Sequence, residues 1–198
     1  MISREENNDK TDYTLVCNKQ NMLLEQDKAK QIYSLHFTLC DNDKINIDTF
    51  LTFKIYELIE KLNPDLIEKI EILNIKSEDE VDVLFIFKHI AKEIGIRQKY
   101  MLLSTKKSIS NTKKLIIFNS KSTELTPDQF SKYNLQKFDR LMCHFADLRI
   151  TIVDSEVKIH YLFKITQTEQ LPIYMENLIG LMMKKIFYNV KQFIEKID

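Results

Sequence analysis

Apolar and polar positions alternate along several stretches of the chain. In residues 33–39, Tyr33, Leu35, Phe37 and Leu39 share one face and polar side chains share the other, and residues 148–152 and 157–165 repeat this pattern on either side of a short polar turn. A period of two is typical of half-buried β-strands. Shorter apolar segments predict further strands, while residues 18–32 fit either a hairpin arm or a short helix. These further strands span residues 13–17, 70–75, 100–105 and 114–120.

Helical spacing and capping signals predict four helices. Ser77 and Glu80 have the spacing of a capping box, and Gly95 stands where a left-handed residue would end that helix. Its interior is apolar on nearly all sides, which is typical of a buried helix. Gly180 lies inside the last helix and predicts a close approach of another element there. The predicted helices span residues 49–62, capped by Asp48, then 77–94, 126–146 and 172–197.

This order of elements predicts an α+β fold in a single two-layer domain. The sheet would be antiparallel or mixed, with helices on one face and a long C-terminal helix. Residues 1–12 are polar and predict a disordered N-terminal arm, and residues 13–198 form the single α+β domain. No apolar stretch reaches the length needed to span a bilayer, and no signal peptide is recognisable. We therefore expect an intracellular protein, cytoplasmic or nuclear, with no membrane partner.

Glycine is scarce, with two residues in 198, and this limits the function classes that fit. Nucleotide cradles and nucleophile elbows depend on glycine, so this scarcity argues against a nucleotide-binding enzyme. Alanine, proline and arginine are scarce as well, and together with glycine they are the residues with GC-rich codons. This bias indicates an AT-rich genome.

The cysteines and histidines carry little indication of catalysis or metal binding. Cys17, Cys40 and Cys143 are widely spaced, which favours reduced, buried thiols. The histidines lack ligand spacing, although His36 and His160 would be neighbours if their strands pair. We expect no catalytic residue, no metal and no cofactor. A cysteine and histidine enzyme, based on Cys143 or Cys40, is the remaining enzymatic alternative.

A lysine-rich segment at residues 97–121 is the strongest charge feature. No acidic residue lies between Glu93 and Glu124, and the flanking strands predict a hairpin with lysines crowded at its tip. Such a tip could hold a phosphate backbone or an acidic protein surface. The alternatives are a nucleic-acid-binding hairpin and a solvated edge on which lysines prevent aggregation. The candidate polyanion-binding residues are Lys106, Lys107, Lys113 and Lys114.

The terminal helix carries more apolar residues than one buried stripe requires. Part of it could pack on the sheet and part could form a protein–protein surface, since methionine adapts to partners. We therefore expect a non-enzymatic interaction module, a subunit of a larger complex, that binds a protein partner through this helix and the lysine-rich hairpin. The sequence leaves a homo-oligomer open. The candidate partner-binding residues are Met182, Ile186, Phe187 and Val190.

Overall fold

The computed structural model describes residues 12–39, 52–89, 92, 95–112, 114–153, 156–167 and 177–195. Several predicted features lie outside these residues: the N-terminal arm up to residue 11, the Asp48 cap, Cys40, Lys113 and the first five residues of the predicted terminal helix. The division into an arm and one domain stays a prediction. None of the described helices is long and apolar enough to cross a membrane.

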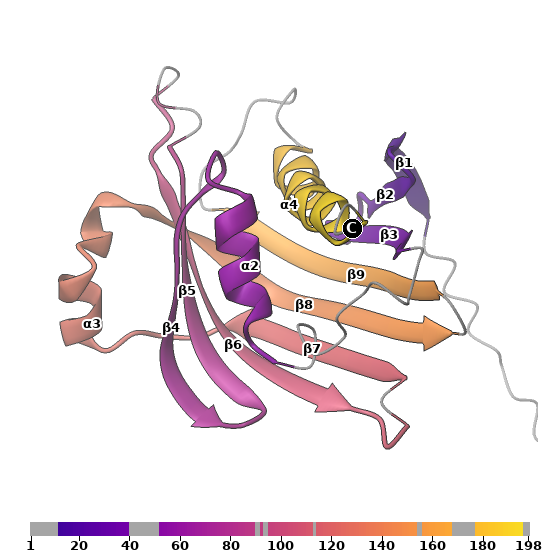
Figure 1. Ribbon diagram of the computed structural model, residues 1–198. Coiled ribbons are helices and arrows are strands. Elements are labelled where there is room, and N and C mark those ends of the chain that lie inside the picture. Colours follow the sequence, from indigo (N-terminus) through magenta and orange to yellow (C-terminus); the bar gives the residue numbers. More distant parts are fainter. Residues whose placement is uncertain are drawn as a thin grey trace, which may run out of the picture.

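A nine-stranded sheet forms the body of the molecule (Figure 1). Its spatial order is β1-β2-β3-β9-β8-β7-β6-β5-β4, and neighbouring strands are antiparallel, with a short parallel contact between β6 and β8. The strands are β1 (Tyr13–Lys19), β2 (Met22–Asp27), β3 (Ile32–Leu39), β4 (Ile67–Ser77), β5 (Glu80–Phe87), β6 (Lys99–Ile109), β7 (Leu115–Ser122), β8 (Asp139–Val153) and β9 (Glu156–Gln167).

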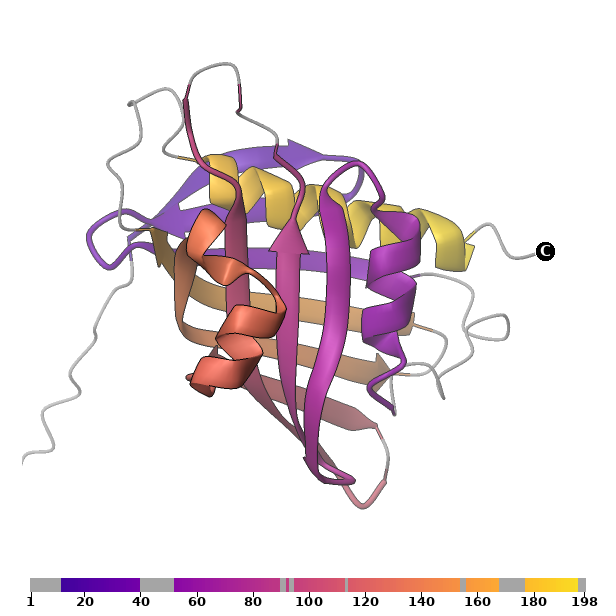
Figure 2. The ribbon, with the colours of Figure 1, turned by 90° about the vertical axis from the view of Figure 1, so that its left-hand side faces the viewer.

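The helices lie on both faces of this strongly bent sheet. Helix α4 (Leu178–Glu195) crosses the concave face, with α2 (Ile55–Leu62) beside it. The short α3 (Pro127–Lys132) and the 3-10 turn η3 (Leu135–Lys137) lie on the opposite face (Figure 2). The prediction of a two-layer α+β domain with helices on one face is therefore wrong: the fold is mostly sheet.

Alternating side chains build the main core on the concave face. The predicted alternation of β3 is confirmed, because Tyr33, Leu35, Phe37 and Leu39 are all buried. Strand β9 pairs with β3 in register, so that Tyr161 lies opposite Leu35 and Phe163 opposite Tyr33. Helix α4 covers these strands with an apolar stripe whose members are Met183, Ile186, Phe187, Val190 and Ile194.

The predicted helix over residues 77–94 is instead a β-hairpin. Ser77 and Glu80 pair across a two-residue turn between β4 and β5, and the Asp79 amide donates to the Ser77 hydroxyl. Residues 81–87 are all buried, since β5 has apolar clusters on both of its faces. A strand buried on both faces has the same continuous apolar run as a buried helix, which explains the error.

The predicted helix over residues 126–146 begins correctly and ends early. The Thr126 and Gln129 capping box forms as expected, with Pro127 in the first turn. The helix ends at Lys132, and Asn134 takes a positive φ of 54° before the turn η3, which leads into β8. The last third of the predicted helix, from Asp139 onward, is strand, in which Leu141, Cys143 and Ala146 are buried beside a bulge.

Both glycines occupy positions that suit them. Gly180 confirms the predicted close approach, because a Cβ there would come within 2.6 Å of the Tyr33 ring. Gly95 has the expected positive φ of 78°, although the regular structure before it is a strand that ends at Phe87.

Candidate functional site

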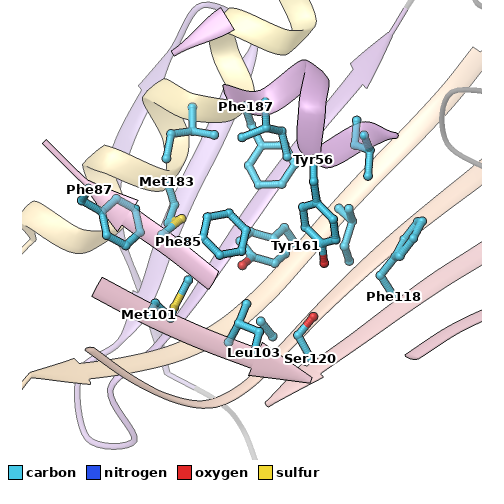
Figure 3. Close-up of a pocket in the computed structure, with 15 residues that line it drawn as sticks. Tyr56, Phe85, Phe87, Met101, Leu103, Phe118, Ser120, Tyr161, Met183 and Phe187 are labelled. Carbon is cyan, nitrogen blue, oxygen red and sulfur yellow. The ribbon is translucent and has the colours of Figure 1, made fainter. Parts of the chain in front are cut away.

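A cavity of about 70 Å³ lies between the concave face of the sheet and the two helices α2 and α4 (Figure 3). Strands β5 to β9 supply its floor, and the helices supply its roof. The lining is almost entirely apolar and aromatic, without a charged side chain. The lining residues are Ile55, Tyr56, Ile59, Phe85, Phe87, Met101, Leu103, Phe118, Ser120, Ala146, Leu148, Tyr161, Met183, Ile186 and Phe187.

Simple periodicity brings these side chains together. On β5 the pleat directs Phe85 and Phe87 to the concave face, and on β6 Met101 and Leu103 point the same way. Residues one turn apart on α2, Ile55 and Ile59, face down onto them. Five strands thus contribute one or two side chains each to the wall, and each of the two helices contributes three.

Buried amides tie the two roof helices together. Asn63 follows α2 and is fully buried; its side-chain nitrogen donates to Ile59 O at 2.8 Å and to Ile186 O at 3.5 Å. Asn189 of α4 donates in turn to Asn63 Oδ1 at 2.9 Å. An ion pair between Lys185 and Asp65 lies nearby and holds the pKa of the Asp65 carboxyl below its usual range. The roof is therefore a linked pair of helices.

Hydroxyl groups form the polar part of the site. The Tyr56 hydroxyl donates to Thr105 Oγ1 at 2.9 Å, and Thr105 and Ser120 hydroxyls are also 2.9 Å apart. Burial raises the pKa of Tyr56 to about 12, against the opposing effect of these hydrogen bonds. Burial also raises the pKa of Tyr161 well above its ordinary value. Both phenols are neutral at physiological pH.

Cys143 lies close to Ser120 of this polar group and lacks the surroundings of a catalytic thiol. It is 2% exposed, and burial, together with the charge of Asp147, raises the pKa of its thiol to about 12. Its sulfur is 4.0 Å from Ser120 O, and among the described residues no histidine hydrogen-bonds to it. A reactive thiol needs a lowered pKa, so this one has the properties of a structural cysteine.

His36 and His160 are neighbours, as expected if their strands pair. Their rings stack at 4.0 Å on the face of the sheet away from the cavity, and both share the Ser34 hydroxyl, at 2.7 and 3.1 Å. Burial lowers the pKa of His160. No group of three or more potential metal ligands occurs within the described ranges.

The predicted partner-binding residues of α4 point mostly inward. Ile186, Phe187 and Val190 are buried, and the first two line the cavity, while Met182 is partly buried against the core. The exposed apolar residues of this helix are others, namely Leu181 and Phe193. No finding tests a binding role for the four predicted residues.

The lysine-rich hairpin forms as predicted, because β6 pairs with β7 from Leu103 to Ile109. Its lysines do not share one surface, however. Lys106 and Lys114 are exposed, whereas Lys107 is buried, with its ammonium 3.2 Å from the Asp79 carboxylate and over the Phe53 ring. A polyanion-binding role for these side chains also stays untested.

Sequence reasoning missed the cavity and the residues that define it. The alternation of residues 157–165 places Tyr161 on the buried face of its strand, but nothing in the pattern distinguishes it from its neighbours. Phe85 and Phe87 fell in the incorrectly predicted helix. A cavity arises where side chains from several elements fail to fill the space between them, so it leaves no local signal.

Neither a protein-family model nor a curated protein matches this sequence. Among solved structures, the human StarD13 (DLC2) lipid transfer and protein localization domain is similar, with a TM-score of 0.73 at 9% identity over 93% of this chain and 90% of that chain. Human StAR-related lipid transfer protein 5 gives a TM-score of 0.72 at 10% identity, with 96% and 89% covered. A STAR-related lipid transfer protein from Xanthomonas axonopodis gives 0.66 at 8%, with 93% and 99% covered. At such identities the likeness shows a shared START-like fold.

These findings correct the predicted function. A complex subunit that binds a protein partner through α4 is wrong, because that helix buries its apolar stripe over a cavity in a fold known from lipid transfer proteins. The nucleic-acid alternative is also wrong, since nothing in the fold or its neighbours supports such a partner.

Proposed function

We propose that this protein binds a lipid or a similar apolar small molecule between the concave face of its sheet and helices α2 and α4. The observation that carries the proposal is the cavity itself: fifteen residues, nearly all apolar, enclose space that the core leaves unfilled. Ligand sites are typically concave and apolar with a few placed polar groups, and this wall has that composition. The solved structures with the same fold include proteins named for lipid transfer.

The size of the cavity sets a condition on binding. Sites for drug-sized ligands measure about 300–1,000 Å³, and this cavity measures about 70 Å³. A lipid therefore requires the roof to lift or side chains to turn aside. Met183 and Phe187 are suited to this, since they come from α4 and lie at the cavity wall, and a methionine side chain adapts readily to new shapes.

Titration with 1-aminoanthracene, a neutral apolar dye, tests the proposal. The chain has no tryptophan, so the fluorescence of the directly excited dye is recorded against a low protein background. We expect saturable binding at one site per chain. Ala146→Leu, which adds methylene groups to the cavity floor, should weaken binding at least about tenfold, because Ala146 is 3% exposed and lines the cavity.

Ala29→Leu is the matched control. Ala29 lies in the exposed turn between β2 and β3, so the same side chain is added far from the lining residues. This variant should bind the dye as the unchanged protein does. Equal binding by both leucine variants, or no saturable binding at all, would overturn the proposed function.

The residues of the site favour ligand binding without catalysis. The thiol of Cys143, whose sulfur lies 4.0 Å from Ser120 O, is held neutral by burial. The two tyrosines of the wall are likewise held neutral, so they can donate hydrogen bonds but are poor bases at physiological pH. We therefore propose a carrier or sensor of an apolar ligand, not an enzyme.

A further inference from the structure

Tyr161 brings a polar atom into the cavity wall without a partner for it. The residue is 9% exposed, and its ring lies between those of Phe163 and Phe187, with centroids 4.7 and 4.9 Å away. Hydrogen bonds to Thr105 and Ser120 act on the Tyr56 hydroxyl, but no described residue hydrogen-bonds to the hydroxyl of Tyr161. In Figure 3 the Tyr161 hydroxyl lies apart from the Tyr56 and Ser120 pair.

The Tyr161 hydroxyl is not one of the fully buried side-chain atoms that lack a hydrogen bond, so it borders the open space of the cavity, where water or a ligand can satisfy it. Its partner therefore comes from the contents of the cavity, since the two rings that pack against Tyr161, those of Phe163 and Phe187, carry no polar atom. A ligand oxygen would serve as that partner, because a phenol donates and accepts hydrogen bonds.

The rest of the wall restricts the charge of the ligand. Its polar members are Tyr56, Ser120 and Tyr161, all of them hydroxyl groups, and no lining residue is charged. The buried lysines of α4 are engaged elsewhere: Lys184 donates to Gln20 Oε1 and Lys191 donates to Thr38 O. A carboxylate or phosphate inside this cavity would lack a counter-charge, and burying an unpaired charge is strongly unfavourable.

We infer that the ligand is a neutral lipid with a hydroxyl or carbonyl oxygen, and that the Tyr161 hydroxyl hydrogen-bonds to that oxygen. The inference rests on the proposed function and names its ligand class. Tyr161 is a specificity residue here: the apolar wall holds the hydrocarbon, and the phenol selects for one uncharged polar atom.

Three ligands with the same ten-carbon chain separate these contributions. Decane, 1-decanol and decanoate are each used to displace bound 1-aminoanthracene at pH 8, where decanoate is charged. We expect 1-decanol to bind about fivefold more tightly than decane, the size of one net hydrogen bond. Decanoate should bind more weakly than 1-decanol by tenfold or more.

Tyr161→Phe tests the assigned residue. In this variant the preference for 1-decanol over decane should fall to within about twofold, while the affinity for decane stays the same. Tyr188→Phe is the matched control, because Tyr188 lies on α4 but outside the cavity lining, and its hydroxyl accepts a hydrogen bond from Gln192. The midpoint of thermal unfolding without ligand reports folding, and removing an unpartnered hydroxyl should not lower it.

The outcomes distinguish the two proposals. If the dye binds and Ala146→Leu blocks it, but Tyr161→Phe keeps the full preference for 1-decanol, the role of Tyr161 is overturned and the proposed function stands. Binding of decanoate as tight as that of 1-decanol overturns the neutral ligand class. If the dye and all three ligands fail to bind, the proposed function itself falls.

Discussion

Strands β5 and β6 carry two apolar clusters, one on each face, that are closed in different ways. On the convex face Leu84 and Leu102 pack around Leu135, which η3 inserts fully buried. On the concave face their sequence neighbours Phe85 and Leu103 line the cavity under α2 and α4. One-residue alternation thus separates a cluster that η3 covers from side chains that line the cavity. Substitutions on the two faces should therefore have different effects on stability and on the proposed ligand binding.

Leu135→Ala should produce the largest loss of stability, because it empties the centre of the convex cluster. We expect the free energy of unfolding, measured by urea titration, to fall by about 3 kcal/mol. Dye binding by the folded variant should not change, because Leu135 is not part of the cavity wall. Leu181→Ala, at an exposed leucine of α4, is the control and should cost little. A loss of dye binding in folded Leu135→Ala would contradict the separation of the two faces.

Asn63→Ala should have a smaller effect on stability and a specific effect on the concave face. It removes the buried amide between α2 and α4 and leaves Asn189 without one acceptor, which we expect to cost about 2 kcal/mol. Because the roof helices are then less tightly linked, the dye should associate and dissociate faster, measured by stopped-flow fluorescence. Asn74→Ala, which removes a half-exposed hydrogen bond to Asp82 on β4 and β5, is the control and should leave both dye rates unchanged.

The same two faces mark how far the sequence determines the fold. Strands with one wet face, such as residues 33–39 and 157–165, were predicted correctly, because alternation is visible when one side is polar. In residues 81–87 both faces of the strand are buried, because α3 and η3 cover the second face. The alternation is therefore not visible in the sequence, and the apolar run predicts a helix. As a result, the expected sheet lacks β5, and an additional helix over residues 77–94 is expected on one of its faces.

The site was less predictable than the fold for a related reason. The stripe of α4 was recognised, but Ile186 and Phe187 were assigned to a protein partner because a stripe alone does not say what covers it. The answer depends on β5 to β9 curving beneath that helix, which is a property of the whole sheet. What distinguishes Tyr161 is that its hydroxyl lies at the cavity wall without a hydrogen bond from any described residue, and the sequence pattern carries no sign of this.

Gly180→Ala should cost about 1 kcal/mol of unfolding free energy. The added Cβ would lie 2.6 Å from the Tyr33 ring, and this ring stacks on Phe163 at 5.3 Å, so it cannot turn away freely. Overpacking of this kind costs roughly 1–3 kcal/mol, and the better helix propensity of alanine returns up to about 1 kcal/mol. Urea titration measures the net change. An increase in stability would show that the contact between α4 and β3 has more room than the geometry indicates.

Alkaline pH should lower the free energy of unfolding, in part through two groups buried on the concave face, Cys143 and Tyr56. In the unfolded chain a thiol has a pKa near 8.5 and a phenol near 10, whereas burial raises the pKa of both Cys143 and Tyr56 to about 12. Above pH 8.5 the unfolded state therefore loses protons that the folded state keeps, and the free energy of unfolding falls as pH rises toward 12. Below pH 8.5 this contribution is fully present.

Single substitutions report two sources of that alkaline fall separately, while Tyr161, whose pKa burial also raises, remains in every variant. Cys143→Ala should flatten the curve of stability against pH between about 8.5 and 10, and Tyr56→Phe should flatten it above about 10. Cys17→Ala, at a half-exposed cysteine of β1, is the matched control and should leave the curve parallel to that of the unchanged protein. Urea titrations at intervals of half a pH unit measure these slopes. If all four curves run parallel, the buried thiol and phenol do not hold their protons as the geometry of the concave face requires.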